Sequence, residues 1–276
     1  NKNSVNNIFT NITANSSGAD GIYLNQSTKN TFINVIANSN TNSGIYITRS
    51  SNNTFINITA KSNSQNGIHI YYNSENNTIN NSYIENNTQY GMYFESSGTD
   101  YPQYNTIYNN LFNNTVNYFN TENTTNYFNT TLICSVGSNI IRGHCMGGNY
   151  WTNPDGTNFS DTCTDVNYTS ICDSAYILDG NNSDYLPLTV IPTFTLSIWD
   201  DSDNSSIPIN TSVKFYANYT GIDNSAINNE TSSNGSCLVK FNTTGPWTPQ
   251  QNMTFNSSSQ LYEYNKTFNS TGTFPF

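Results

Sequence analysis

Apolar and polar positions repeat along the first part of the chain. Four segments align with one another: 7–24, 30–47, 53–70 and 77–94. A glycine opens the second half of each copy: Gly21, Gly44, Gly67 and Gly91. These glycines follow one another after 23, 23 and 24 residues, and a weaker fifth copy begins at 105–107, after an insertion near Pro102. A fixed period of this length predicts a repeat protein, because each unit is too small to bury its own apolar side and must pack on the next.

Each copy contains two short pieces with the pattern of β-strands. The first piece has one large apolar residue in register: Phe9, Phe32, Phe55 and Ile79. The second piece follows the glycine, and its residues alternate between two faces. One face is entirely apolar: Ile22, Leu24, Ile45, Ile47, Ile68, Ile70, Met92 and Phe94. The other face carries Tyr23, Tyr46, His69 and Tyr93, and we expect His69 to be a solvated surface residue. The pieces are too short and too rich in β-branched and aromatic residues for helices.

This pattern predicts a right-handed parallel β-helix with coils of about 23 residues over residues 1–132. Equivalent strands of successive coils would pair in parallel about 4.8 Å apart and bury continuous apolar columns. Asparagines at the turns tolerate a left-handed backbone, and stacked Asn side chains can hydrogen-bond along the axis. Leucine-rich repeats have a similar length, but their Leu/Asn consensus is missing.

Residues 133–190 carry three further motifs: Gly147-Gly148-Asn149-Tyr150-Trp151, the stretch 172–180, and Asp184-Tyr185-Leu186-Pro187-Leu188. With these motifs, residues 1–190 resemble the parallel β-helix proteins of the NosD-like and carbohydrate-binding/sugar-hydrolase type, as found in archaeal surface proteins. The resemblance implies that 133–190 closes the β-helix. The family usually has an Asp/Gly-rich stretch between 156 and 171. Here Asp155, Asp161 and Asp165 lie in a looser loop, which weakens the case for a calcium site.

Alternating strands replace the repeats from Thr193 onward. They include 194–198, 213–219, 237–241 and 262–268, and turn clusters separate them. The spacing predicts a small antiparallel β-sandwich over 191–276. It is similar to the immunoglobulin-like modules of archaeal surface proteins. We expect the natural protein to continue beyond Phe276, and either further coils or another subunit to cover the N-terminal end.

Composition limits the partners of such a solenoid. Only 9% of the residues are charged, the net charge is −10, and there are 8 Lys and Arg residues. An acidic chain with few cations repels phosphate backbones, so we exclude nucleic acid as a partner. No apolar run approaches the ~20 residues of a membrane span, so we expect no membrane insertion by this segment.

The chain contains about two dozen N-x-Ser/Thr sequons. Several of them predict covalent N-glycans, although a chain rich in Asn, Ser and Thr also produces sequons by chance. The candidate sites are Asn11, Asn57, Asn76, Asn86, Asn129, Asn167, Asn210, Asn242 and Asn265.

Five cysteines occur, and spacing does not settle their connectivity. Local pairing suggests Cys134 with Cys145 and Cys163 with Cys172, and each bond would contribute roughly 2–3 kcal/mol. Cys237 is left over, and we expect its partner beyond Phe276. The sequons and the polar acidic surface favour disulfides, and with them an extracellular location at the cell surface.

Two stretches contain residue types that bind metals. His144-Cys145-Met146 offers soft ligands, and NosD-like proteins include copper-processing members; however, a copper site needs several convergent ligands, and we assign Cys145 to a disulfide. Asp200, Asp201 and Asp203 form a weak calcium candidate, but the later Gly and bidentate Glu of an EF-hand are missing, which favours a solvated turn. We expect no cofactor, with a structural Ca²⁺ as the alternative.

The acids of the coils form no column: Asp20, Glu75, Glu85, Glu95, Asp100 and Glu122. Glycoside hydrolysis needs two carboxylates placed together, so we expect no enzyme activity. We expect a structural, self-assembling and adhesive glycoprotein of the cell exterior, in a surface layer or an extracellular filament. Its partners would be copies of itself and surface glycans. The alternative is a carbohydrate-binding or carbohydrate-processing β-helix. In that alternative, the outward residues Tyr23, Tyr46, His69 and Tyr93 would stack on sugars. We favour the interpretation that these side chains pair across neighbouring strands and stabilise the sheet.

Overall fold

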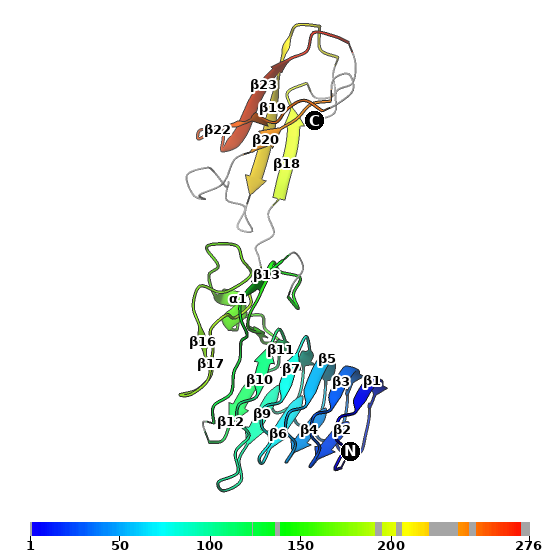
Figure 1. The fold of residues 1–276 in the computed structure, drawn as a ribbon. Coiled ribbons are helices and arrows are strands. Elements are labelled where there is room, and N and C mark those ends of the chain that lie inside the picture. The colour runs from blue at the N-terminus through cyan, green and yellow to red at the C-terminus, as the bar shows by residue number, and fades with distance from the viewer. Residues whose placement is uncertain are drawn as a thin grey trace. The chain divides into compact units, whose positions relative to one another are not determined.

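The computed structural model describes residues 2–122, 124–135, 139–190, 195–202, 206–220, 237–242 and 247–271. The chain divides into two compact units, Asn1–Ile191 and Pro192–Phe276. The first unit is a parallel β-solenoid and the second carries small antiparallel sheets (Figure 1). The all-β fold predicted from the repeat is therefore confirmed.

Sheet 1 of the solenoid has eight parallel strands, which follow the order β1-β3-β5-β8-β11-β15, with β7 pairing with β5 and β10. Its strands are β1 (Ile8–Thr13), β3 (Thr31–Ile36), β5 (Thr54–Lys61), β7 (Thr78–Asn80), β8 (Tyr83–Glu85), β10 (Thr106–Tyr108), β11 (Leu111–Asn113) and β15 (Tyr150–Thr152).

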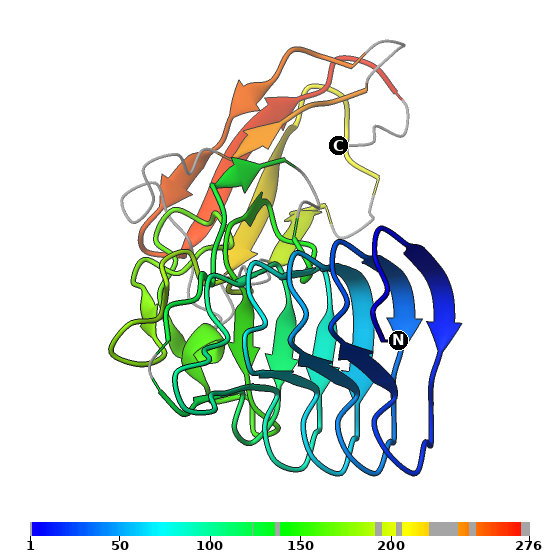
Figure 2. The same cartoon turned by 60° about the horizontal axis from the view of Figure 1, so that its bottom comes forward.

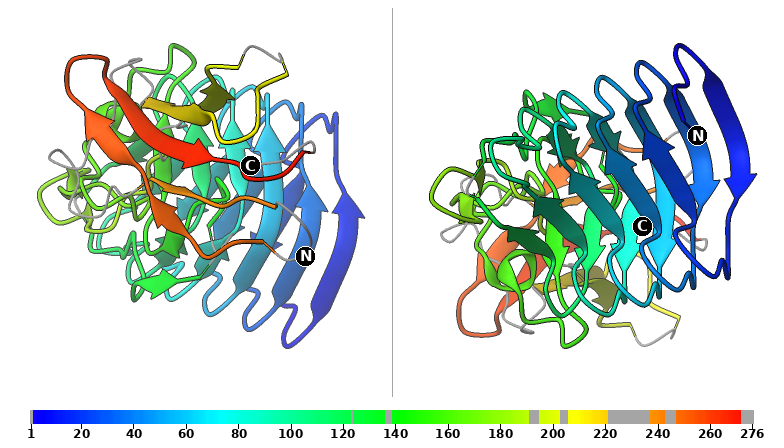
Figure 3. Two further views of the ribbon diagram at one scale, coloured as in Figure 1. Left: turned by 90° about the horizontal axis from the view of Figure 1, so that it is seen from above. Right: turned by 90° about the horizontal axis from the view of Figure 1, so that it is seen from below.

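Sheet 2 has five parallel strands in the order β12-β9-β6-β4-β2. They are β2 (Ile22–Asn25), β4 (Ile45–Thr48), β6 (Ile68–Tyr71), β9 (Met92–Glu95) and β12 (Tyr118–Asn120). Figures 2 and 3 show successive coils side by side in chain order, from blue to green. Each strand pairs with the equivalent strand of the next coil, so residues of one type stand above one another.

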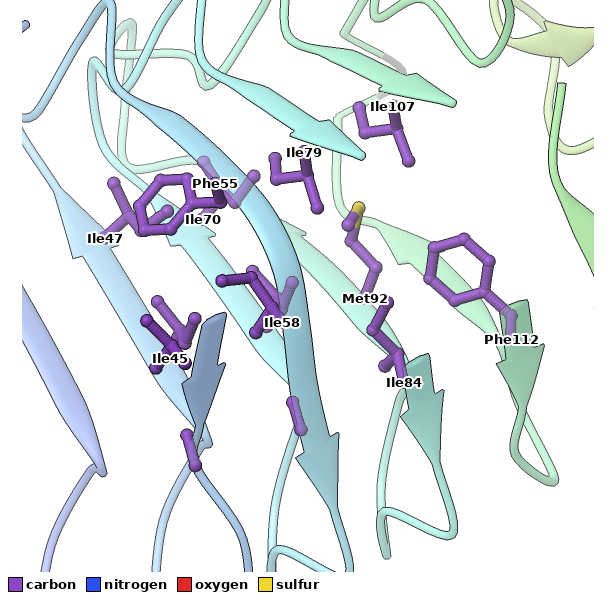
Figure 4. Packing of buried hydrophobic residues seen from close by; sticks show 14 of the residues in the cluster. Ile45, Ile47, Phe55, Ile58, Ile70, Ile79, Ile84, Met92, Ile107 and Phe112 are labelled. Carbon is purple, nitrogen blue, oxygen red and sulfur yellow. The ribbon is translucent and has the colours of Figure 1, made fainter. Parts of the chain in front are cut away.

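The inward residues of both sheets meet in one apolar cluster. Phe9 pairs in register with Phe32 and Phe32 with Phe55, and their rings stack at 4.8 and 5.0 Å between centroids. Ile79 and Ile107 continue this column in the next two coils. Figure 4 shows the buried side chains pointing into the space between the sheets. Parallel register thus converts the repeat into stacked columns that exclude water.

Asparagines with a left-handed backbone bend the long strands of sheet 1. Asn11, Asn34 and Asn57 lie within β1, β3 and β5 with φ of 55°, 57° and 55°. Asn tolerates this conformation better than most residues. Because of the bend at Asn57, the buried residues Phe55 and Ile58 of β5 lie three positions apart rather than two, whereas Ile58 and Ala60 keep the usual spacing of two.

Buried asparagine side chains form a ladder along the axis. The backbone N–H and the Nδ2 of Asn53 donate to Oδ1 of Asn77, at 2.9 and 3.1 Å. Asn30 donates to Oδ1 of Asn53 in the same way, also at 2.9 and 3.1 Å. The stacking of asparagines along the axis is therefore confirmed. We call this set ladder A: Asn7, Asn30, Asn53, Asn77, Asn105, Asn126 and Asn182.

Two further ladders use the same bonds at other corners of the coils. Ladder B consists of Asn40, Asn63, Asn87, Asn114 and Asn117. Ladder C is shorter and consists of Ser82, Asn110 and Asn149. The ladders satisfy backbone groups at the turns, which in a narrow solenoid would otherwise be buried without partners.

Removing one rung of ladder A should be costly. An Asn53→Ala variant leaves the backbone N–H and Nδ2 of Asn30, and the carbonyl of Ser27, without the partner that Asn53 supplies. Since unsatisfied buried polar groups cost about 1–3 kcal/mol each, we expect a loss of about 2–4 kcal/mol in the free energy of unfolding. Urea denaturation would measure it against Thr41→Ala, an exposed turn position that should change little. Equal effects of the two substitutions would contradict a structural role for the ladder.

The closing part of the first unit contains short elements: β13 (Ile133–Cys134), β14 (Cys145–Met146), α1 (Phe159–Thr162), β16 (Tyr176–Ile177) and β17 (Ser183–Asp184). The side chain of Asn158 caps α1 by accepting from the N–H of Phe159, at 2.8 Å. Asp161 completes a capping box by accepting from the N–H of Asn158, at 2.9 Å.

The second unit contains a four-stranded antiparallel sheet in the order β18-β19-β23-β22 and a two-stranded sheet of β20 and β21. Val213 and Phe215 of β19 share an apolar cluster with Val239 of β20 and with Phe241. Two antiparallel sheets therefore pack on each other in the described part of this unit. The strands are β18 (Thr195–Asp200), β19 (Ser212–Thr220), β20 (Leu238–Val239), β21 (Gln251–Asn252), β22 (Thr254–Asn256) and β23 (Leu261–Thr267).

Candidate functional site

A column of aromatic rings lies on the outward face of sheet 2. Tyr23 and Tyr46 stack at 5.4 Å between ring centroids, and the centroids of Tyr46 and His69 lie 4.7 Å apart. His69 and Tyr93 stack at 4.6 Å, and Phe119 of β12 lies 5.8 Å from Tyr93. The period of two along each strand places these side chains outward, and parallel register places them above one another. We call these five residues the ring column.

Further tyrosines cover the flanks of the ring column. Tyr71 lies 6.2 Å from Tyr46, and Tyr90 stacks on Phe119 at 4.8 Å. The rings inside the column therefore use their faces on one another, and sugar stacking needs an open ring face. The end rings are more open, with Tyr23 43% and Phe119 42% exposed. Burial and the neighbouring Tyr23 raise the pKa of Tyr46 to about 12, so its hydroxyl stays neutral.

The expectation that His69 is solvated is wrong. Its side chain is only 13% exposed, because the neighbouring rungs of the ring column cover both sides of the imidazole. Burial lowers the pKa of His69 to about 4 and raises the pKa of Glu95, whose Oε2 lies 2.9 Å from His69 Nε2. Near neutral pH the imidazole of His69 is therefore neutral.

The depressed pKa of His69 predicts a stability that depends on pH. The unfolded chain takes up this proton near pH 6.5, and the folded chain only near pH 4. The stability that neutral His69 contributes to the folded state is therefore complete above about pH 6.5 and is lost as the pH falls towards 4. Relative to His69→Tyr, we expect the wild type to lose about 2–3 kcal/mol between pH 7 and 4.5. Urea denaturation at both pH values measures the difference, and parallel pH profiles of the two proteins would contradict it.

Two disulfides hold the closing segment. Cys134 is bonded to Cys145, which joins β13 and β14, and Cys163 is bonded to Cys172. These are the two local pairs that the spacing suggested. Cys237 is unpaired and half-buried, and its Sγ lies 3.5 Å from Sδ of Met253.

Two of the three motifs of the closing segment, 147–151 and 184–188, meet at one buried carboxylate. Asp184 is fully buried and accepts from the N–H of Asn149 at 2.7 Å, from Nε1 of Trp151 at 2.9 Å and from the N–H of Leu186 at 3.1 Å. Burial raises the pKa of Asp184 to about 7, and these hydrogen bonds oppose the rise. Gly148 lies so close that a Cβ there would be 1.9 Å from Asp184 Oδ1. The sequence motifs therefore encode one tightly packed contact, which sequence reasoning alone did not reveal.

The other acids singled out in the sequence serve local bonds. Asp161 accepts from the hydroxyls of Tyr150 and Thr152, each at 2.8 Å. Asp165 accepts from the N–H of Ser170 at 2.7 Å. Asp155 is an exposed turn residue. The structure brings these three carboxylates into no common site among the described residues.

The weak calcium candidates belong to a turn of the second unit. Asp200 accepts from the N–H of Ser202 at 2.8 Å, and Asp201 accepts from the N–H of Lys214 at 2.9 Å. Asp203 lies outside the described residues. The carboxylate of Asp200 thus closes a local turn, and that of Asp201 bonds to the neighbouring strand β19.

The candidate glycosylation sites lie mostly at the surface. Asn129 and Asn242 are half-buried. The remaining sites are exposed: Asn11, Asn57, Asn76, Asn86, Asn167, Asn210 and Asn265.

Residues 1–156 match the family described as "Periplasmic copper-binding protein (NosD)". The chain belongs to the NosD family. This match covers ladders B and C, ladder A as far as Asn126, the ring column and the Gly147–Trp151 motif. No curated protein and no solved structure matches the chain. The two disulfides, together with membership of a periplasmic family, indicate a location outside the cytoplasm. No helix in the described ranges is long and apolar enough to cross a membrane.

The residues matched to the NosD family do not fit a copper site. Copper prefers convergent thiolate, thioether and imidazole ligands. In the candidate stretch His144-Cys145-Met146, Cys145 is bonded to Cys134, His144 is exposed and Met146 is half-buried. Met92 is buried in the apolar core, and His69 is enclosed in the ring column. Across the described ranges, no three or more His, Cys, Asp or Glu side chains gather where they could hold a metal ion. We therefore derive no copper chemistry for this chain.

Proposed function

We propose that the chain is a structural component of the cell exterior, in which the β-helix acts as a rigid scaffold and carries out no catalysis. The observation that supports this most strongly is the use of side chains in repeated contacts. The ladder asparagines bond to one another along the axis, and aromatic residues stack within the Phe column and the ring column. The ionisable residues of the coils also have structural neighbours: Lys61 Nζ lies 3.0 Å from Glu85 Oε2, and Glu95 lies beside His69.

We also propose a location, an assembly and partners for the protein. It places the chain in a surface layer or an extracellular filament of archaeal type, built from copies of itself, N-glycosylated and in contact with surface glycans. It treats the second unit as an immunoglobulin-like module. Support comes from the disulfides, the exposed sequons and the low content of charged residues.

Assembly is tested by raising the concentration of the purified chain. Sedimentation velocity and negative-stain microscopy should reveal ordered layers or filaments that grow with concentration. A sample treated with glycosidase serves as the control for glycan-mediated solubility. Monodisperse single particles at every concentration, with and without glycans, would contradict self-assembly.

Glycosylation is tested by the intact mass of material from its natural source. We expect a mass above the 30.8 kDa of the polypeptide, in steps of sugar residues. A mass equal to that of the polypeptide, after allowance for the disulfides, would contradict the glycoprotein part of the proposal.

Carbohydrate binding at the ring column is the second candidate, because some polar atoms of the coils that carry it lack partners. Oδ1 of Asn25, Oδ1 of Asn66 and Oγ of Ser96 are buried without a hydrogen-bond partner among the described residues. Such atoms usually bind water or ligand hydroxyls. A glycan array with wild type, Tyr46→Ala and Tyr83→Ala tests this candidate, since Tyr83 is a half-buried tyrosine of sheet 1. Binding that only Tyr46→Ala loses would favour it, and an array without wild-type binding would exclude it.

A further inference from the structure

The amide ladders have a direction. In ladder A, the backbone N–H of each Asn before the last donates towards the C-terminal end of the solenoid, where Oδ1 of the next Asn accepts it, as Asn53 and Asn77 show. From Asn7 to Asn105, Nδ2 donates to the same Oδ1. Asn110 donates to Asn149 in the same sense in ladder C, at 3.1 and 3.0 Å. The amide dipoles of a ladder are therefore aligned, and each bond polarises the next.

A directed ladder needs a different acceptor at its last rung. The backbone N–H and the Nδ2 group of that rung both donate, but no further Asn follows to accept their hydrogen bonds. A carboxylate is an acceptor only, so it can take both hydrogen bonds without presenting a new donor that needs a partner. An amide at this place would accept the bonds but expose its own NH₂ group.

Ladder A ends on Asp179. Its last rung, Asn182, donates its backbone N–H to Oδ1 of Asp179 at 2.9 Å, and its Nδ2 to Oδ1 and Oδ2 at 2.8 Å each. Tyr118 and Asn120 also donate to Oδ2, at 2.6 and 3.2 Å. Burial alone would raise the pKa of Asp179, but the hydrogen bonds from Tyr118, Asn181, Asn182 and Asn120 hold it below its usual value.

Ladder C ends on Asp184 in the same manner. Its last rung, Asn149, donates its backbone N–H to Oδ2 of Asp184 at 2.7 Å. Nδ2 of Asn149 lies 3.3 Å from the same oxygen and donates at shorter distances to the carbonyls of Ile107 and Phe128. Ladder B ends on another group that only accepts, because Nδ2 of Asn117 donates to the backbone carbonyl of Thr152. Each of the three ladders thus ends on an oxygen atom that accepts hydrogen bonds and carries no hydrogen to donate.

We propose that Asp179 and Asp184 are stop residues: each ends an amide ladder and thereby fixes where coil stacking stops. They lie only five positions apart in the sequence, on either side of Asn182, yet they terminate two separate ladders. The stretch 179–184 is therefore the end signal of the solenoid. This inference is independent of the proposed function, because it concerns the end of the fold and not its role in the cell.

The isosteric variants Asp179→Asn and Asp184→Asn test the inference, with Asp155→Asn as a matched control at an exposed turn. The measurement is hydrogen exchange of backbone amides by NMR in the full chain. In Asp179→Asn we expect the protection of Asn182 and Asn126 to fall by about tenfold or more, because the new NH₂ group faces the ladder donors. Protection in ladder C and in the control should stay unchanged.

Asp184→Asn should show the reciprocal result, with lower protection of Asn149 and Asn110 and an intact ladder A. If Asp184→Asn does not fold, the half-buried Asp179 carries the test alone. Unchanged protection of the terminated ladder, or an equal loss in both ladders, would overturn the assignment of stop residues.

Discussion

Gly148→Ala is expected to destabilise the folded chain by more than about 4 kcal/mol, or to prevent folding of the solenoid, since large core clashes rank among the most severe substitutions. The new Cβ would lie 1.9 Å from Oδ1 and 2.5 Å from Cγ of Asp184. Asp184 cannot move away, because it is fully buried and holds donors from Asn149, Trp151 and Leu186. Denaturation in urea, followed by tryptophan fluorescence and circular dichroism, measures the loss.

The matched control for this substitution is Gly18→Ala. A Cβ at Gly18 meets nothing within 4 Å, so its stability should stay within about 0.5 kcal/mol of wild type. A Gly148→Ala protein as stable as Gly18→Ala would show that Asp184 is not held against this backbone.

Phe55→Ala is the second substitution with a large expected effect. Phe55 is fully buried, and its ring stacks on Phe32 in the column that also contains Phe9. Truncation would leave a cavity between the sheets, and such losses cost about 3–5 kcal/mol. The midpoint of urea unfolding should fall accordingly, whereas the denaturant m-value should stay the same.

Phe119→Ala separates core packing from surface stacking. Phe119 is aromatic and stacked on Tyr90, but it is 42% exposed on the outward face. Its truncation should cost about 1 kcal/mol, the usual value of an aromatic pair. Equal costs for Phe55→Ala and Phe119→Ala would contradict the division into inward and outward columns.

The stacked coils could be predicted because the repeat shows them directly. Strand alternation alone assigned Ile45 and Ile47 to the core and Tyr46 to the outside, and the register in the structure agrees. The disulfide pairs followed from local spacing. These features depend on contacts that recur at a fixed separation, and a fixed separation is visible in a sequence.

Features that depend on unique contacts could not be predicted. Asp184 meets Asn149 across 35 positions, and Asn182 meets Asn126 across 56, after the repeat has ended. No period relates these residues. The burial of His69 was missed for a different reason: alternation fixes which side of a strand a residue occupies, but not how closely its neighbours cover it.

The ladders also offer a physical reason for part of the sequon content. In Asn52-Asn53-Thr54 the first Asn has a φ of 59° and is exposed, the second is a ladder rung, and Thr54 begins β5. Asn76-Asn77-Thr78 repeats this arrangement one coil later. The turn geometry therefore favours Asn, Asn and a β-branched residue in succession. Where the β-branched residue is Thr, this order produces a sequon whether or not a glycan is attached.

The pairs Asn52/Asn53 and Asn76/Asn77 provide the most direct test of the laddered solenoid, because neighbours in sequence have opposite roles. NMR hydrogen exchange of their side-chain carboxamide protons measures both roles in one sample. The account predicts that the carboxamides of Asn53 and Asn77 exchange as slowly as the backbone amides of β5. Those of Asn52 and Asn76 should exchange at the rate of a free asparagine. Equal rates for the two members of each pair would contradict it.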